Sequence, residues 1–135
     1  MAFRLEKMGK SFLVFDDESQ EASKVAGGFM NPVILKRFTL AWKADEQLEK
    51  ACSFYSDAED LLKKPLLAPL EIYRRFSSVE EQNNWFAAAD KPRLAPFLDT
   101  NLVSEVNPNI PGEFSFGRLR KTARFDPKGF LESYA

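Results

Sequence analysis

Apolar residues recur every three or four positions between Asp45 and Lys64. This stripe consists of Leu48, Ala51, Cys52, Tyr55, Ala58 and Leu62. The spacing is that of an amphipathic helix, and it predicts about five turns with one face on a core. Asp45 is the expected N-cap, and Lys63, Lys64 and Pro65 are typical of a helix end.

A different pattern precedes this helix. Phe3 and Leu5 alternate with charged residues, and in a hairpin with a two-residue turn at positions 8 and 9 Leu5 would face Phe12 and Phe3 would face Val14. Such a period of two predicts a β-hairpin over residues 3–15, with its apolar side chains on one face. The turn can have two residues or be a longer loop, because Met8 is a poor residue for positive φ.

The segment between the predicted hairpin and helix has two parts. Residues 16–26 are polar and acidic, and they predict a loop or one short helix that stops at Gly27 and Gly28. Residues 33–42 are rich in β-branched and aromatic residues and predict a strand. On that strand one face would carry Ile34, Phe38, Leu40 and Trp42.

Two further helices are predicted after Pro65. Pro69 suits the first position of a short helix that runs to Phe76. The overlapping sequences 77–80 and 78–81 both have the Ser-x-x-Glu pattern of a capping box, which starts a helix from Val79 to about Ala89.

Together these elements predict an α+β fold in one small domain. We expect an N-terminal β-hairpin and a further strand to be packed by two to three helices, within a core domain of residues 1–106. Residues 107–135 lack a long periodic segment and are punctuated by proline and glycine. We expect them to form an extended C-terminal arm, whose apolar residues pack either on its own core or on a partner.

The composition narrows the class of protein. A chain of 135 residues with 44% hydrophobic residues and 13 phenylalanines is typical of an ordered globular domain. The net charge of −1 gives no overall field that would attract DNA or anionic lipid. The chain has no histidine, which excludes Ser-His-Asp and Cys-His catalysis and Cys/His zinc sites made by this chain alone.

The sequence also bears on the cellular compartment of the protein. Residues 4–7, three of which are charged, do not resemble a signal peptide, and no apolar run approaches transmembrane length. Cys52 is the single cysteine and cannot form an internal disulfide. We therefore expect no membrane association and a cytoplasmic protein, or one of the host cytoplasm if the protein is viral.

The best candidate for contact with a partner lies in the expected arm. Residues 114–125 carry four basic side chains and no acidic one, between apolar residues that can act as anchors. The predicted partner-binding residues are Ile110, Phe114, Phe116, Arg118, Arg120, Lys121, Arg124, Phe125 and Phe130.

No catalytic, cofactor-binding or metal-binding residue is predicted. The acids Asp57, Glu59 and Asp60 lie on the outer face of the first predicted helix, where Glu59 and Asp60 each have a lysine four residues later. They indicate a solvated surface rather than a metal or catalytic pair, because nothing apolar surrounds them to raise a pKa.

These observations favour a non-catalytic interaction or assembly protein of the structural, adaptor or inhibitor type. Small viral structural proteins are among those built in this way, which is an argument by analogy. We expect the C-terminal arm to dock on a partner subunit or on another copy of the chain. The alternative is a module that binds single-stranded nucleic acid weakly through the basic and aromatic segments 33–43 and 114–125. An enzyme that uses carboxylates and tyrosines ranks last.

Overall fold

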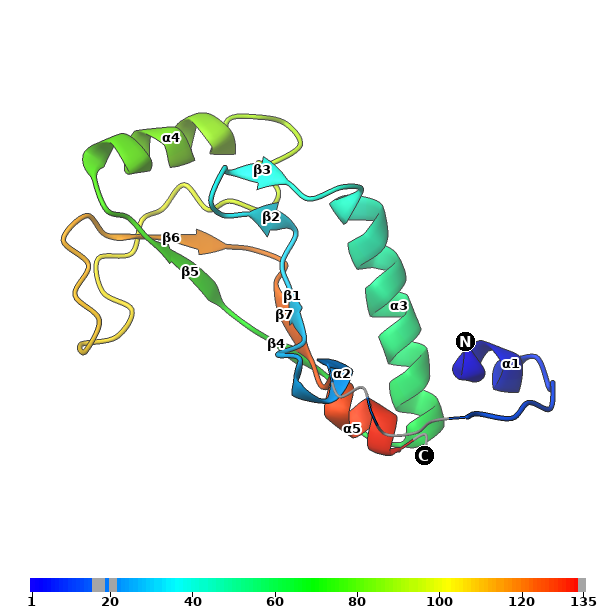
Figure 1. Ribbon diagram of the computed structural model, residues 1–135. Coiled ribbons are helices and arrows are strands. Elements are labelled where there is room, and N and C mark those ends of the chain that lie inside the picture. Colours follow the sequence, from blue (N-terminus) through cyan, green and yellow to red (C-terminus); the bar gives the residue numbers. More distant parts are fainter. Residues whose placement is uncertain (16–18, 20–21, 134–135) are drawn as a thin grey trace.

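The computed structural model describes residues 1–15, 19 and 22–133, and within these it contains five helices and seven short strands (Figure 1). The helices are α1 (Ala2–Lys7), α2 (Ala22–Val25), α3 (Ala44–Leu62), α4 (Val79–Ala89) and α5 (Pro127–Glu132). The strands are β1 (Phe29–Met30), β2 (Val33–Ile34), β3 (Thr39–Leu40), β4 (Leu67–Pro69), β5 (Ile72–Arg75), β6 (Phe116–Leu119) and β7 (Ala123–Phe125). The predicted α+β class is confirmed.

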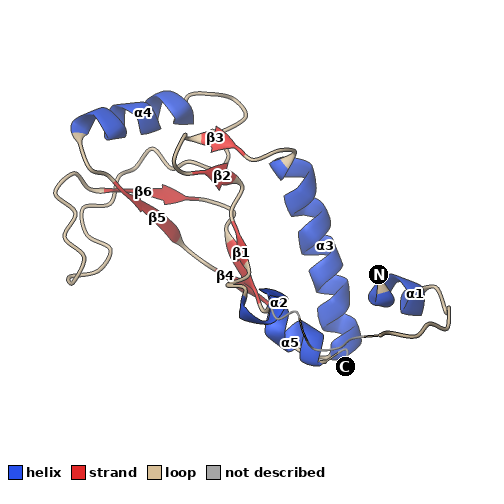
Figure 2. Cartoon of the chain, viewed as in Figure 1, coloured by secondary structure: helices blue, strands red, loops and turns tan. Residues whose placement is uncertain are grey.

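The strands form three small antiparallel sheets (Figure 2). In the largest, β7 lies between β1 and β4, while β5 pairs with β6 and β2 pairs with β3. Residues 116–132 of the expected C-terminal arm form β6, β7 and α5, and β6 and β7 pair with strands of the expected core domain. Their pairing partners β1, β4 and β5 all precede residue 106, so the pairing crosses the expected boundary of the core domain.

Two clusters of buried side chains hold the elements together. The first surrounds Trp85 and combines residues of α4, the β2–β3 hairpin, the turn at 94–98 and β6. The second contains Phe3, Ala58, Leu66 and Phe125. Helix α3 spans both clusters, since Leu48 packs on the first and Tyr55 on the second. The Tyr55 ring stacks on Phe125 with centroids 3.8 Å apart.

Helix α4 forms as its sequence predicts. The Ser78 side chain accepts a hydrogen bond from the backbone N–H of Glu81, as expected for an N-cap. The helix buries Trp85 completely, with its ring edge-on to Phe76 at 5.5 Å. Gly117 of β6 leaves room for this ring, because a Cβ there would come within 2.6 Å of it.

Two segments that were predicted as β-structure have another structure. Residues 2–7 of the expected hairpin form α1, because Arg4 to Lys7 are good helix formers and Phe3 buries itself on Phe54 of α3, 4.8 Å away. Residues 33–42 are not one strand but a hairpin, which turns back through Phe38 at a φ of 47°. Phe38 is buried as expected, whereas Ile34 and Trp42 are exposed.

The predicted helix from Pro69 to Phe76 is also wrong. This segment contains the last residue of β4 and all of β5, whose β-branched and aromatic residues Ile72 and Tyr73 pair with Leu119 and Arg118. The partner strand lies more than forty residues later in the chain, so local propensity does not indicate it.

The other helices agree better with the sequence. Helix α3 is confirmed, but Lys43 rather than Asp45 occupies its N-cap, and Cys52 is exposed rather than buried. Helix α2 corresponds to the short helix expected before Gly27, whereas the acidic residues 16–18 lie outside the described residues. No helix in the described part of the chain has the length and apolar character needed to cross a bilayer.

Glu59 has a role that the predicted solvated face did not suggest. Its Oε1 atom accepts hydrogen bonds from the backbone N–H groups of Leu66 and Leu67, at 2.6 and 2.8 Å. These bonds, first that of Leu67, lower the pKa of the Glu59 carboxyl. At the outer edge of β4, Leu67 donates its backbone N–H to Glu59, and Pro69 has no backbone N–H to donate. This edge therefore offers no free backbone donor at either position.

We predict that Glu59→Ala lowers the melting temperature, because two backbone donors at the start of β4 lose their acceptor. The matched control is Asp60→Ala, at the next, exposed position of the same helix. Since the folded pKa of Glu59 is lowered, its contribution is present above its usual pKa and is lost as the pH falls through the folded value. Equal melting temperatures for the two variants at neutral pH would contradict this role.

Candidate functional site

The nine predicted partner-binding residues do not form one surface. Phe116 and Phe125 are buried, and Phe114, Arg118 and Phe130 are partly buried. Ile110, Arg120, Lys121 and Arg124 are exposed. The structure brings Arg118, Arg120 and Lys121 together at the end of β6. It places Arg124 on β7, where its cross-strand neighbours are Phe29 and Ala68.

Asp99 organises the arginines of this group. Its side chain is only 1% exposed, and it accepts hydrogen bonds from Nε and Nη2 of Arg118 at 3.2 and 2.7 Å. Arg120 approaches the same carboxylate with Nε at 3.3 Å and Nη2 at 2.9 Å. We call Asp99, Arg118 and Arg120 the arginine clamp. Both guanidinium groups remain about half-exposed on their outer sides.

Backbone pairing sets the position of the clamp. The N–H group of Asp99 donates to the carbonyl of Arg118 at 3.0 Å, and that of Arg120 donates to the carbonyl of Phe97 at 2.8 Å. Trp85 donates its indole N–H to the carbonyl of Asp99 at 2.8 Å. The carboxylate is therefore fixed between β6 and the Trp85 cluster, without an unsatisfied buried polar atom among the described side chains.

The charges of the clamp are largely balanced. The backbone N–H of Asn101 and then the Arg118 guanidinium hold the pKa of Asp99 far below its usual range. Arg118 also lies 3.7 Å from Glu71, which accepts a hydrogen bond of 2.7 Å from the Tyr73 hydroxyl. That bond raises the pKa of Tyr73. An aspartate that stays ionised and has its hydrogen bonds satisfied is suited to holding the arginine side chains in place rather than to acid–base catalysis.

Asp99 was missed by the sequence analysis. The available signal in the sequence was an aspartate between apolar and small polar residues, which is typical of a turn. In the structure, the Asp99 side chain accepts a hydrogen bond of 3.0 Å from the backbone N–H of Asn101. Its two arginine partners lie 19 and 21 positions later. Only the pairing of residues 97–103 with β6 brings these groups together.

The two segments proposed for nucleic acid do converge. Phe38 and Leu119 belong to the same buried cluster, so segments 33–43 and 114–125 are packed together. Trp42 is 77% exposed, and the ammonium group of Lys43 lies 5.4 Å from its ring centroid. On the other segment, the Lys121 ammonium lies 5.6 Å from the ring of Phe97.

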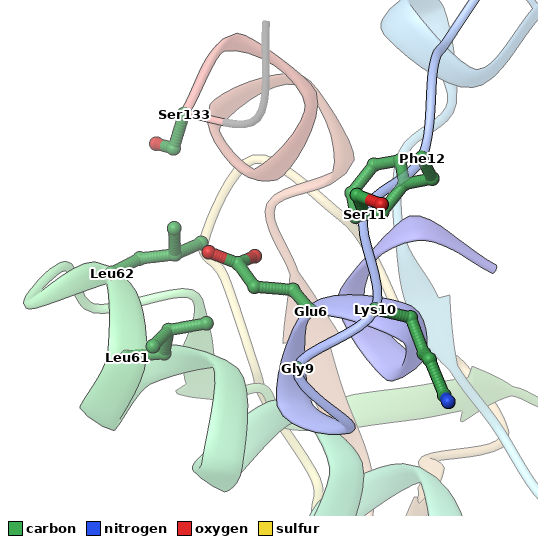
Figure 3. A pocket seen from close by; sticks show the side chains of 8 residues that line it. All are labelled: Glu6, Gly9, Lys10, Ser11, Phe12, Leu61, Leu62 and Ser133. Atoms are coloured by element: carbon green, nitrogen blue, oxygen red, sulfur yellow. The ribbon is translucent and has the colours of Figure 1, made fainter.

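The most exposed apolar run lies at the other end of the molecule. Leu13, Val14 and Phe15 are 84%, 69% and 91% exposed, and residues 8–15 join no strand within the described part of the chain. Phe12 lines a recess of about 570 Å³, to which Leu61 and Leu62 of α3 also contribute (Figure 3). We call residues 12–15 the apolar segment.

Comparison with known proteins gives no assignment, since no protein-family model and no solved structure matches this chain. Within residues 1–15, 19 and 22–133, no three acidic or cysteine side chains gather as a group able to hold a metal ion.

We predict that Asp99→Asn destabilises the protein by about 2 kcal/mol at neutral pH, because the charged acceptor of two arginines is lost. The control is Asp90→Asn, at an exposed position after α4. Because the folded pKa of Asp99 is lowered, its stabilisation is complete above the usual aspartate pKa of about 3.9 and declines below it. The stability difference between wild type and Asp99→Asn should shrink as the pH falls from about 4 in chemical denaturation. A difference independent of pH would contradict this account.

Proposed function

We propose that this protein is a non-catalytic assembly protein that associates with further copies of itself through the apolar segment. The observation that carries the proposal is the exposure of three consecutive apolar side chains, Leu13, Val14 and Phe15. Isolated exposed apolar residues are ordinary, whereas a contiguous exposed run is characteristic of interaction sites.

The apolar segment is presented by an anchored element. Phe3 of α1 is buried against Phe54, and the Lys7 ammonium lies 2.5 Å from the Asp57 carboxylate, also on α3. The chain then leaves α1 through Gly9, whose φ is 65°. The segment therefore starts from a fixed position on α3, which lowers the conformational entropy lost on association.

This proposal moves the expected docking surface from the C-terminal arm to the N-terminal part. Phe116 on β6 and Phe125 on β7 are both buried within the fold. They cannot serve as anchors on a partner without leaving their own core.

The character of the arginine clamp supports a non-catalytic protein. Its carboxylate is buried and satisfied by hydrogen bonds, and the chain has no histidine to act as a base near neutral pH.

We predict that the double variant Leu13→Asp and Phe15→Asp abolishes self-association and leaves the melting temperature nearly unchanged. Two charges on the segment oppose its burial in an interface, while neither side chain contributes to a core. Light scattering coupled to size exclusion, over a wide range of protein concentration, measures the mass.

The matched control is Val79→Asp, because Val79 is also an exposed apolar residue and an acid is favourable at the start of α4. This control should associate as the wild type does. Wild-type protein that remains a monomer throughout, or equal association of the double variant, would refute the proposal.

A second candidate function is the binding of single-stranded nucleic acid, favoured by the exposed ring of Trp42 beside Lys43. Bases stack on exposed aromatic rings while nearby cations neutralise phosphates. The arginine clamp weakens this candidate, since Asp99 already engages two of the four basic residues of segment 114–125.

For this second function, an oligothymidylate should quench the fluorescence of Trp42, because the other tryptophan, Trp85, is fully buried. If Lys43, Lys121 and Arg124 contact phosphates, the log–log slope of affinity against salt is about −2.1. If the two clamp arginines also contribute, the slope is about −3.5. Absence of quenching at low salt excludes this function.

A further inference from the structure

We propose that the apolar segment of one copy inserts into a groove between β1 and α3 of a second copy. This inference rests on the proposed self-association and names the surface that receives the segment. The groove has a volume of about 230 Å³, and its walls include Met30, Pro32, Ala41, Ala44, Leu48 and Ala51.

The groove is suited to a large apolar side chain. Three of its lining residues are alanines, so the walls leave space that a larger side chain from outside can fill. None of the described residues that line it is charged, and the segment Ser11 to Phe15 also carries no charge. Neither surface would therefore have to desolvate an ion on contact.

The adjoining edge of the sheet is open. Within the described residues β1 pairs on one side only, with β7, and Phe29 of β1 is 69% exposed at the rim of the groove. The opposite edge, β4, is protected by Glu59 and by Pro69, as described above. A strand that adds to this sheet therefore meets fewer obstacles at β1.

The segment of the same chain lies at a different part of α3 from this groove. Phe12 lines the same recess as Leu61 and Leu62, near the C-terminal end of α3, whereas the groove lies at Ala44 to Ala51 (Figure 3). Leu61 lies ten residues after Ala51, which corresponds to about 15 Å along the helix axis. None of the described residues that line the groove belongs to the apolar segment of the same chain, so the groove is open to the segment of another copy.

The area involved is adequate for a dimer. A reciprocal exchange brings in Leu13, Val14 and Phe15 from each copy, and an aromatic side chain alone can bury about 150–250 Å². These six apolar side chains and the groove surface that they cover reach roughly 1,000 Å², which is the lower range of specific interfaces. The expected assembly is therefore a closed dimer of modest affinity rather than an obligate one.

Cys52 provides a direct test, because it is exposed and follows Ala51 at the groove. A variant carrying Val14→Cys and Cys52→Ser is mixed with wild-type protein, and a short bismaleimide is added. Any link between position 14 and Cys52 must then join two copies. We expect this product to form, and we expect little from the control Val106→Cys with Cys52→Ser, whose thiol lies on another exposed loop.

The groove is tested separately by Ala51→Arg and by Phe29→Asp, with Ser56→Arg as the control on an exposed position of α3. We expect both groove variants to raise the dimer dissociation constant about tenfold or more and to reduce the cross-link, and the control to do neither. Phe29→Asp changes an exposed side chain, so it remains informative if Ala51→Arg lowers the melting temperature.

The outcomes separate this inference from the proposed function. If the wild type dimerises through the apolar segment but the groove variants dimerise equally and no link to Cys52 forms, the groove assignment is wrong and assembly stands. If the wild type is a monomer, both are wrong. A link to Cys52 that the groove variants abolish and Ser56→Arg retains supports both.

Discussion

The antiparallel pairing of residues 116–125 with three earlier strands is the constraint on which the rest of the structure depends. β6 pairs with β5, and β7 lies between β1 and β4. Strands of two to four residues are not stable in isolation and need an apolar face that packs on the rest of the protein. Leu119 supplies that packing to the Trp85 cluster and Phe125 supplies it to the cluster on α3. One segment thus completes both cores.

The same pairing decides the electrostatics of the surface. In the sequence, segment 114–125 is a run of positive charge without an acid, yet in the fold Asp99 lies under two of its arginines. The buried carboxylate reduces the local field and fixes the orientation of both guanidinium groups. Charge counted along a chain therefore overestimates the charge that a ligand meets, wherever a distant acid is brought in by strand pairing.

How much the sequence predicts depends on whether the signal is local. Helices α3 and α4 follow from their apolar spacing and, for α4, from the cap at Ser78, all of which lie within one segment. The strand β5 was mistaken for a helix because its partner β6 lies far along the chain. Arg118, Arg120 and Lys121 were identified by local charge. Asp99 was not, because its burial arises from contacts with β6. Leu13 to Phe15 are exposed because residues 3–15 do not form the predicted hairpin, in which Val14 would have faced Phe3.

The central place of β7 in its sheet has a consequence for biosynthesis. Chains leave the ribosome from the N-terminus, so β1 and β4 emerge well before the strand that separates them in the finished sheet. Until residue 125 has been released, both strands expose their inner edges and Tyr55 has no ring to stack on. The sheet therefore cannot form before β7 has left the ribosome, and until then the nascent chain depends on dilution or chaperones to keep these edges apart.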